Sequence, residues 1–364
     1  MLDLKPIKEF SPYNGKSIII AGPCSAETEE QTLQTAQELV KIGIHIFRAG
    51  IWKPRTKPGG FEGAGSRGLP WITRVKRETG MSVTTEVANP HHVEAALKAD
   101  IDILWIGART AANPFTVQEI AESLKGTDTP VMVKNPINPD IELWIGALER
   151  LNQAGIKRLA AIHRGFSSYS ESIYRNPPQW QIPIELRRRI PSLPIISDPS
   201  HMAGRRDLIS SLSQTALNMQ ADGLMIEVHP NPDSALSDSI QQITPPQLKE
   251  LLQQLVEFKS PDENETLGLK SYRSGLDKCD QKLLDILNER FQIAAQIGVY
   301  KKSHHLTVLQ SDRYNEVTER LMAQAEKLRI SPECIQNIFE AIHSESIRQQ
   351  LDAITGNQPN KTDK

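Results

Sequence analysis

One strand–helix–strand unit is contained in residues 17–50, which read SIIIAGPCSAETEEQTLQTAQELVKIGIHIFRAG. Ser17–Ala21 is typical of a buried strand, Glu29–Ile42 has the periodicity of an amphipathic helix, and His45–Phe47 predicts the next strand. The same alternation predicts strands at Val83–Thr85, Ile103–Ile106, Val131–Val133, Leu159–Ile162, Ile195–Ile196 and Leu224–Ile226, with helices that include Pro90–Ala99, Val117–Leu124, Asp140–Ala154 and Arg205–Gln220. Eight strand–helix units are typical of a (β/α)8 barrel, an α/β fold whose chemistry lies at the C-terminal ends of the strands.

Side chains with catalytic or ligand-binding chemistry follow every one of these predicted strands. Because the C-terminal ends of barrel strands meet at one rim, these side chains are expected to gather there. A barrel with so many ionisable groups at one rim is expected to be an enzyme. In chain order the groups are Cys24, Arg48, Lys53, Glu86, Arg109, Lys134, His163, Arg164, Asp198, His201, Glu227 and His229.

The bulk composition limits the class of protein. A single barrel takes about 250 residues, so a chain of 364 residues has room for a second domain. The net charge of −2 creates no overall field that would attract nucleic acid or an anionic membrane. The sequence has neither a signal-peptide pattern nor a run near the roughly 18 apolar residues of a membrane helix. Three widely spaced cysteines, Cys24, Cys279 and Cys334, do not suggest a disulfide framework, so we expect a cytoplasmic protein.

The composition changes near residue 259. Lys259–Thr266, with the sequence KSPDENET, is short and polar and is typical of a linker. Beyond it Pro and Gly become rare, and Leu267–Lys302, Asp312–Lys327 and Pro332–Ile354 have helical periodicity. The predicted organisation is a barrel domain over 1–258, a linker over 259–266, a separate all-α three-helix domain over 267–354 and a polar tail over 355–364.

Cys24, His201, Glu227 and Asp238 form a candidate metal site. A thiolate, an imidazole and two carboxylates are a mixed set of soft and hard ligands, which suits Mn, Fe, Co or Zn better than Ca or Mg. Each residue alone has a simpler explanation, since a cysteine after a strand is commonly a small buried apolar residue and a histidine can cap a helix. Their convergence from three stretches on one rim favours the metal site.

Six cations form a second candidate cluster at the same rim. Exposed Lys and Arg are usually just solvated, but so many positive charges at one barrel mouth indicate bound anions, most simply two phosphorylated small molecules. A Schiff-base aldolase that uses Lys53 or Lys134 is the rival interpretation. The metal set argues against it, because a metal and a Schiff base are alternative ways of activating a carbonyl. The six cations are Arg48, Lys53, Arg55, Arg109, Lys134 and Arg164.

Six motifs of the barrel resemble one known family. They are AGPCS at 21–25, FRAGIWKPRT at 47–56, IGAR at 106–109, HRG at 163–165, SDPSHMAGRRD at 197–207 and IEVHP…ALSD at 226–238. In this order they resemble 3-deoxy-D-arabino-heptulosonate 7-phosphate (DAHP) synthase of the type I-beta group. The related KDO 8-phosphate synthase has Ala-Asn where this chain has Pro54, so the resemblance implies erythrose 4-phosphate as the aldehyde substrate. Lys134-Asn135-Pro136 departs from the Lys-Arg-Gly that is common in the family.

The resemblance also implies roles for single residues. Lys53 would lie between the two substrates and protonate the developing alkoxide. Glu86 would position the attacking water or have a structural role. The N-terminal regulatory domain of some relatives is not expected here, because the first predicted strand begins by about Lys16. The metal would be bound by Cys24, His201, Glu227 and Asp238, phosphoenolpyruvate by Arg48, Arg109, Lys134 and Arg164, and the phosphate of erythrose 4-phosphate by Arg55 and Thr56.

Two cations of the first C-terminal helix point the same way. Arg290 and Lys301 are eleven residues apart, which places them on one face about 16 Å apart along the axis, close enough for both to bind one small dianion. Arg273 faces roughly 100° away and lies about 25 Å from Arg290 along the helix, so it can join this site only if the helix breaks or if it comes from the other chain of a dimer. Solvated charges on an amphipathic helix are the alternative explanation.

The C-terminal segment resembles the all-helical chorismate mutase family over nearly its full length. In that family catalysis needs only orientation and charge complementarity. Lys301 and Gln350 would face the ether oxygen of chorismate, where negative charge builds up as the bond breaks. Gln310 and Tyr314 depart from the Asp and Glu that are common in the family, which could reduce activity unless Asp312 substitutes. The matching positions are Arg273, Asp280, Glu289, Arg290, Lys301, Arg313, Ser346 and Gln350.

Together the two resemblances imply a bifunctional shikimate-pathway enzyme. The barrel would condense phosphoenolpyruvate with erythrose 4-phosphate, and the helical domain would convert chorismate to prephenate. The helical domain is also expected to form a homodimer or a larger oligomer and to mediate feedback inhibition by prephenate or chorismate. The alternatives are a mutase-like domain that serves only regulation or dimerisation, and a related phosphoenolpyruvate–aldose phosphate synthase. A nucleic-acid module is disfavoured, since 267–364 has no basic cluster with stacking aromatic residues.

Overall fold

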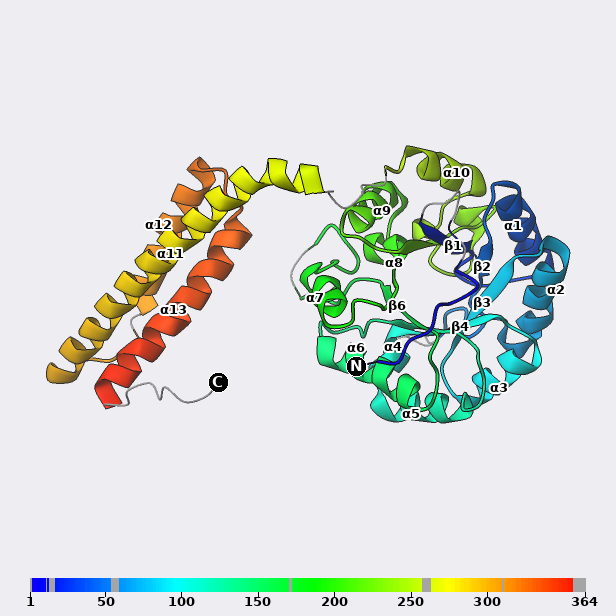
Figure 1. Cartoon of the computed structure of the whole chain (residues 1–364), viewed down its shortest axis with the longest axis horizontal. Coiled ribbons are helices and arrows are strands. Elements are labelled where there is room, and N and C mark those ends of the chain that lie inside the picture. Colours follow the sequence, from blue (N-terminus) through cyan, green and yellow to red (C-terminus); the bar gives the residue numbers. More distant parts are fainter. Residues whose placement is uncertain are drawn as a thin grey trace. The chain divides into compact units, whose positions relative to one another are not determined.

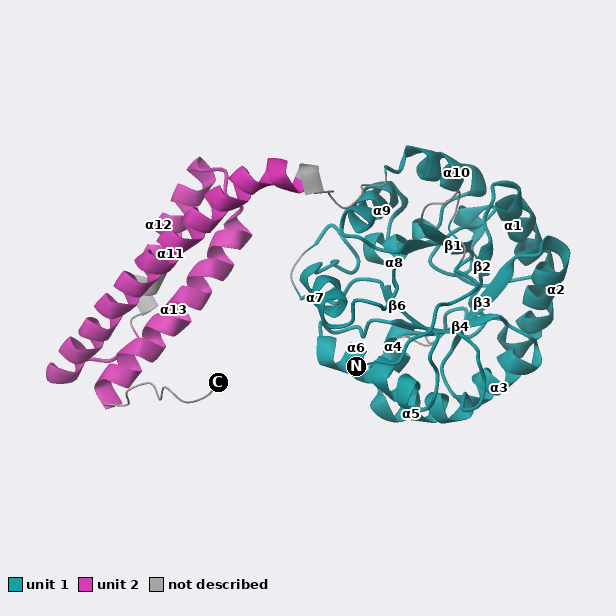
Figure 2. Cartoon of the chain, in the orientation of Figure 1, with its two compact units in different colours: residues 1–259 teal, residues 260–364 magenta. Residues whose placement is uncertain are grey.

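The computed structural model describes residues 2–10, 12, 17–53, 59–169, 172–256, 263–309 and 311–355, with the backbone alone for 263–265 and 311–314. The chain divides into two compact units, residues 1–259 and residues 260–364 (Figure 2). Among the described residues, no helix is both long enough and apolar enough to cross a membrane.

Eight parallel strands form a closed barrel in unit 1 (Figure 1). The strands pair in chain order, and the barrel closes because the first strand pairs with both the second and the eighth. Ala21 therefore lies opposite Phe47 on one side and Ile226 on the other. The predicted (β/α)8 fold is confirmed. The strands are β1 (Ile18–Gly22), β2 (Ile46–Arg48), β3 (Ser82–Val87), β4 (Ile103–Ile106), β5 (Val131–Lys134), β6 (Leu159–His163), β7 (Ile195–Ser197) and β8 (Gly223–Glu227).

Helices follow the strands and surround the barrel (Figure 1). Some begin where a polar side chain caps the first turn: Thr28 accepts a hydrogen bond from the backbone N–H of Gln31, and Asp140 from that of Leu143. The helices are α1 (Glu29–Lys41), α2 (Leu69–Thr79), α3 (Pro90–Lys98), α4 (Ala108–Ala111), α5 (Pro114–Ser123), α6 (Ile141–Gln153), α7 (Gln181–Arg189), α8 (Pro199–Ala203), α9 (Ile209–Asn218) and α10 (Pro245–Gln254). Of these, α2, α4, α7, α8 and α10 lie outside the ranges named from the sequence.

The alternation of side chains along the strands separates two layers of core. Outward-facing residues such as Phe47 pack beneath the helices, and inward-facing residues such as Ile46 and Trp105 fill the barrel. Side chains two positions apart on a strand point the same way. The polar residues near the strand ends therefore point toward the barrel mouth, because each lies two positions beyond an inward-facing apolar residue. These residues include Arg48, Lys134, Asp198 and Glu227, which follow Ile46, Met132, Ile196 and Met225.

His163, the last residue of β6, faces the helical layer instead. Its side chain is buried, its Nε2 lies 2.6 Å from the carbonyl oxygen of Pro178, and its ring meets the edge of Trp180 at a centroid distance of 5.1 Å. Burial lowers the pKa of His163 to about 4. The ring is therefore neutral in the folded protein at neutral pH.

This pKa predicts acid sensitivity of the barrel. The folded-state pKa of His163 lies below the unfolded value, so its contribution to stability is complete above about pH 6.5 and is lost as the pH falls toward 4. The His163 contribution to the unfolding free energy of the barrel should fall by about 2 kcal/mol between pH 7 and pH 5. Urea titrations at both pH values should show this loss in the native chain and not in His163→Phe. The exposed His91 serves as control, and His91→Gln should show the same fall in unfolding free energy between pH 7 and pH 5 as the native chain. If His91→Gln diminished this fall as much as His163→Phe, the assignment to His163 would be contradicted.

Unit 2 contains three long helices in the part that the structure describes, α11 (Glu263–Ser303), α12 (Ser311–Lys327) and α13 (Pro332–Thr355). Helix α11 begins inside the stretch 259–266 that the sequence analysis assigns to the linker. Helices α11 and α13 pack closely at Gly298, where a Cβ atom would lie 2.7 Å from the carbonyl oxygen of Gln350. Apolar side chains of α11 remain exposed in the single chain, including Leu276, Leu283 and Leu284, each at least 60% exposed.

Candidate active sites

The loop after β1 brings the thiol of Cys24 to the barrel mouth. Gly22 permits this course, since a Cβ atom there would lie 2.0 Å from the carbonyl oxygen of Arg48. The backbone N–H of Cys24 donates to the side-chain oxygen of Gln242 at 2.9 Å, and Nζ of Lys53 donates to the carbonyl oxygen of Cys24 at 2.8 Å. Cys24 is fully buried, and these two hydrogen bonds fix its backbone from both sides.

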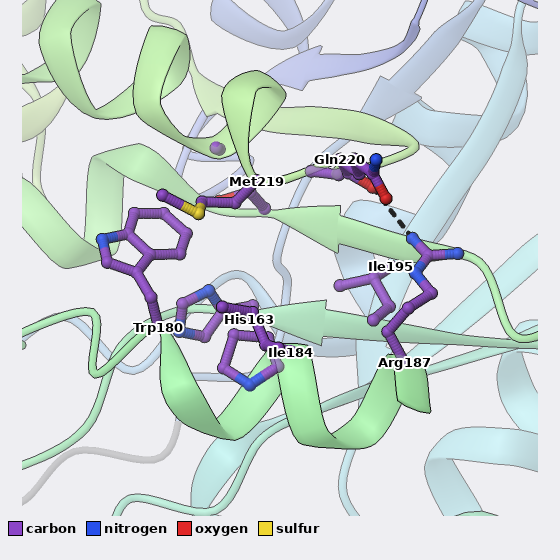
Figure 3. Close-up of a pocket in the computed structure, with 11 residues that line it drawn as sticks. His163, Trp180, Ile184, Arg187, Ile195, Met219 and Gln220 are labelled. Atoms are coloured by element: carbon purple, nitrogen blue, oxygen red, sulfur yellow. Dashed lines mark hydrogen bonds between the residues drawn. The ribbon is translucent and has the colours of Figure 1, made fainter. Parts of the chain in front are cut away.

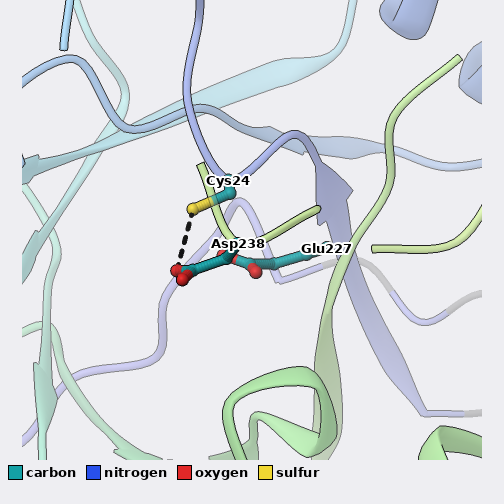
Figure 4. Close-up of side chains that lie close together, drawn as sticks. All are labelled: Cys24, Glu227 and Asp238. Carbon is teal, nitrogen blue, oxygen red and sulfur yellow. Dashed lines mark hydrogen bonds between the residues drawn. The ribbon is translucent and has the colours of Figure 1, made fainter. Parts of the chain in front are cut away.

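Three of the four predicted metal ligands form one cluster (Figure 4). One ligand atom from each of Cys24, Glu227 and Asp238 lies within 4.8 Å of the other two. Sγ of Cys24 donates to Oδ2 of Asp238 at 3.4 Å. Burial, together with the charge of Glu227, raises the pKa of the Cys24 thiol to about 12. The thiol therefore keeps its proton at neutral pH unless a metal displaces it.

His201, the fourth predicted ligand, lies beside this cluster. Its Nε2 is 3.8 Å from Oε1 of Glu227, and its Nδ1 is 2.8 Å from Oδ2 of Asp198. Asp198 also caps α8 by accepting the backbone N–H of His201 at 3.1 Å, which fixes the turn that carries the imidazole. Burial lowers the pKa of His201, which favours the neutral ring. A carboxylate on one ring nitrogen is the usual environment of a metal-binding histidine.

Arg48 and Lys134 lie near the ring of Trp105 inside the barrel. Cζ of Arg48 is 5.0 Å and Nζ of Lys134 is 6.0 Å from the ring centroid, which are cation–π distances. Both cations are buried and paired, Arg48 with Glu227 at 3.1 Å and Lys134 with Asp198 at 2.9 Å. Nε and Nη1 of Arg48 are buried and have no hydrogen-bond partner among the described residues, so these two donors can bind an anion.

Lys53 lies next to the cluster, directly after the β2 region. Burial disfavours its charged form, but neighbouring negative charges, including the carboxylates of Glu227 and Glu86, outweigh burial and raise the pKa of Lys53. Its ammonium group therefore stays protonated and can act as a general acid. Glu86 accepts a hydrogen bond from the indole N–H of Trp105 at 3.0 Å, a contact that fits a structural role in holding the ring.

Arg164 follows β6 and is held by the next loop. Its Nη1 donates to Oδ1 of Asn176 at 2.7 Å. Burial lowers the pKa of Arg164 to about 10, and the positive charges of Arg175 and Arg109 act in the same direction. Three guanidinium groups are thus close enough to interact, which favours a bound anion. Two further predicted residues, Arg55 and Thr56, lie outside the described residues.

The structure adds site residues that sequence reasoning did not assign a role. Asp198 pairs with both Lys134 and His201, and its position before Pro199 at a helix start was the available signal. Arg175 pairs with Oδ1 of Asp238 at 3.1 Å, and Gln241 donates to Oε2 of Glu227 at 2.6 Å. Arg175 comes from a loop and Gln241 from a single 3₁₀ turn (Ser239–Gln241), and no sequence pattern marks either residue.

In unit 2, predicted site residues connect α11 and α13. Nη1 of Arg290 donates to the hydroxyl of Ser346, and burial lowers the pKa of Arg290. Oε1 of Gln350, one turn further along α13, is buried and has no hydrogen-bond partner in the part of the chain that is described. Lys301 is buried and donates to the carbonyl oxygen of Val308 at 2.6 Å. Arg273 is exposed, and the side chains of Arg313, Tyr314 and Gln310 lie outside the described residues.

Two family models match adjacent segments of the chain. Residues 10–262, which are most of its length, match the DAHP synthetase I family. The chain belongs to the DAHP synthetase I family. Residues 272–351 match chorismate mutase type II. The protein is therefore an enzyme that joins a DAHP synthase barrel to a chorismate mutase domain.

Individual relatives agree with this assignment. The chain is 36% identical over 242 residues to a phospho-2-dehydro-3-deoxyheptonate aldolase of Thermotoga maritima, covering 66% of this chain and 70% of that protein. The crystal structure of a DAHP synthase from the same organism matches with a TM-score of 0.60 and 34% identity, over 66% of this chain and 68% of that one. A 2-dehydro-3-deoxyphosphooctonate aldolase of Desulfotalea psychrophila is 29% identical over 265 residues, covering 67% of this chain and 90% of that protein.

Proposed function

We propose that the barrel condenses phosphoenolpyruvate with erythrose 4-phosphate to give DAHP and phosphate. The observation that carries this proposal is the pair of buried cations Arg48 and Lys134 beside the cluster of Cys24, Glu227 and Asp238. The two buried N–H groups of Arg48 without partners among the described residues suit the carboxylate of phosphoenolpyruvate. Lys134, together with Arg164 and the neighbouring Arg109 and Arg175, suits the phosphate of phosphoenolpyruvate.

The carbon count of the product separates this reaction from that of the related octulosonate synthases. Phosphoenolpyruvate supplies three carbons, so a heptulosonate requires a four-carbon aldehyde and an octulosonate a five-carbon one. The sequence Lys-Pro-Arg-Thr at 53–56 and the higher identity to the Thermotoga relative favour the four-carbon aldehyde. A five-carbon aldose phosphate remains the alternative substrate, and a direct comparison of the two aldehydes decides between them.

In the proposed reaction, C3 of phosphoenolpyruvate attacks the aldehyde carbon while Arg48 holds the carboxylate. Lys53 gives its proton to the alkoxide oxygen that forms. A water molecule then adds to C2, the bond between C2 and the phosphate oxygen breaks, and phosphate leaves. Lys134, Arg109 and Arg164 stabilise the negative charge of the departing phosphate.

The residues at the mouth fit a divalent transition metal. The donor set combines a thiol and two carboxylates within 4.8 Å with an adjacent imidazole that is buried and favoured neutral. Cys24, His201, Glu227 and Asp238 would hold it. When bound there, Mn, Fe, Co or Zn supplies Lewis-acid polarisation of the aldehyde oxygen.

Cys24→Ala should contain less bound metal than the native chain and lose synthase activity, because the thiolate ligand is gone. Treatment of the native chain with a chelator should remove its activity, and a divalent transition metal should restore it. Metal content measured by elemental analysis, together with the rate of phosphate release, checks both results. The exposed Cys279 is the matched control, and Cys279→Ser should keep native metal content and activity. Full activity of exhaustively metal-free protein would refute the metal requirement.

We propose that unit 2 rearranges chorismate to prephenate. The Arg290–Ser346 contact places a guanidinium group where it suits a substrate carboxylate, and the buried amide oxygen of Gln350 lies one turn away. Lys301 would turn from the carbonyl of Val308 toward the ether oxygen when chorismate binds. The alternative is a mutase-like domain that serves only as a sensor or for dimerisation, and an assay of chorismate consumption by the intact chain distinguishes the two.

The exposed apolar face of α11 supports a homodimer in which Arg273 of one chain completes the mutase site of the other. Mixed Arg273→Ala and Arg290→Ala chains should then recover part of the lost mutase activity. We also propose that prephenate or chorismate bound at this site inhibits the barrel. Titration of both compounds should inhibit DAHP formation by the native chain and not by Arg290→Ala.

A further inference from the structure

A cavity of about 100 Å³ lies between α7 and α9, on the outer side of β6 and β7 (Figure 3). Trp180, Ile184 and Met219 supply its apolar walls. Ile184 and Met219 are about half exposed, so the cavity opens to the surface between them. This volume is about two thirds of the roughly 150 Å³ of an apolar cavity that binds benzene, so a single six-membered ring is the largest group that it suits, with part of the ring at the open mouth.

One polar group in the cavity lacks a partner. Ser197 is 1% exposed and lines the cavity, and its hydroxyl has no hydrogen-bond partner among the described residues. Buried hydroxyl groups are normally satisfied, so this one indicates a ligand with a hydrogen-bonding group.

The charges around the cavity favour a neutral ligand. Arg187 at its edge is paired with Asp222 at 2.5 Å, which compensates its charge. His163 is neutral at physiological pH, and its Nε2 donates to the carbonyl oxygen of Pro178. Neither group is left to attract an anion.

The cavity lies directly behind the proposed active site. Its lining residue His163 precedes Arg164, and its lining residue Ser197 precedes Asp198. The backbone N–H of Asp198 donates to the carbonyl oxygen of His163 at 2.7 Å, so the two strand ends are joined. A ligand that shifts either lining residue therefore acts on Arg164 or Asp198 through one peptide bond.

We propose that this cavity binds a neutral single-ring molecule of the phenol class, and that its occupancy alters the binding of phosphoenolpyruvate at the rim. The ring packs against Trp180, and the ligand hydroxyl pairs with the hydroxyl of Ser197. This goes beyond the proposed function, and only its second half rests on that function.

Calorimetric titration of the full chain with phenol and with toluene tests the binding. Phenol should bind saturably. Ser197→Ala should lower the affinity for phenol by about two- to tenfold and leave the affinity for toluene unchanged. Ala216→Met, which fills the cavity, should abolish both. Ser213 is the matched control, because its hydroxyl is also buried and without a partner among the described residues but does not line the cavity. No saturable binding of phenol, or equal weakening by Ser213→Ala, would overturn the site.

The KM for phosphoenolpyruvate tests whether occupancy of the cavity alters the binding of phosphoenolpyruvate at the rim. Phenol should change this KM in the native chain and in Ser213→Ala, and not in Ala216→Met. Saturable binding of phenol with an unchanged KM for phosphoenolpyruvate would overturn the proposed effect of the cavity on the rim. Phenol binding as described, in a chain that forms no DAHP, would refute the proposed function and support the binding site.

Discussion

Lys53→Met is expected to lower the kcat of DAHP formation by about 10²–10⁴, the usual contribution of a general acid. Methionine retains the length and apolar stem of lysine but cannot give a proton to the alkoxide. Lys53 is suited to this role because the neighbouring carboxylates of Glu227 and Glu86 help to keep it charged despite its burial. Steady-state measurement of phosphate release, with both substrates varied, should show the loss mainly in kcat.

Lys98 provides the matched control for this experiment. It lies on α3, is mostly exposed, and pairs with Glu94 one turn away at 2.7 Å. Lys98→Met should retain native kinetics, since exposed pairs of this kind contribute little. If Lys53→Met and Lys98→Met had equal kcat values, with the metal content of both unchanged, Lys53 would not be the proton donor.

Arg290→Ala is expected to abolish most of the chorismate rearrangement while leaving DAHP formation intact. Loss of a charged partner in a shielded site costs on the order of 2–5 kcal/mol, which corresponds to a rate loss of roughly 30-fold to several thousandfold. The decrease of chorismate absorbance measures the first activity, and phosphate release measures the second. The separation is expected because the two sets of residues belong to different units of the chain.

Arg348 on α13 serves as the control for Arg290. It pairs with Glu345 and with Asp352 on the surface of its own helix. Arg348→Ala should therefore keep native mutase activity. Native mutase activity in Arg290→Ala would leave unit 2 with a regulatory or dimerisation role instead.

The barrel could be predicted because its strands leave a strong local pattern. Ile103–Ile106, for example, has the same bounds in the structure as in the sequence analysis. The candidate metal cluster could be predicted for a related reason: parallel strands bring their C-terminal ends together whatever their spacing in the chain. That rule placed Cys24 near Glu227 and Asp238 although more than two hundred residues separate them.

Other features depend on geometry that one sequence does not contain. Trp105 looks like an ordinary core residue of β4, and its contacts with Arg48 and Lys134 follow from the register of the closed barrel. Arg175 reaches Asp238 from a loop without periodicity. The position of His201 beside the cluster depends on the short helix α8, which is only five residues long.

The most direct test of the account is the product formed by the purified native chain. With a divalent transition metal present, the chain is incubated with phosphoenolpyruvate and either erythrose 4-phosphate or a five-carbon aldose phosphate, and the products are identified by mass spectrometry. The account predicts the seven-carbon sugar acid phosphate from erythrose 4-phosphate, with release of one phosphate per product. No product from erythrose 4-phosphate, or efficient formation of an eight-carbon product alone, would contradict it.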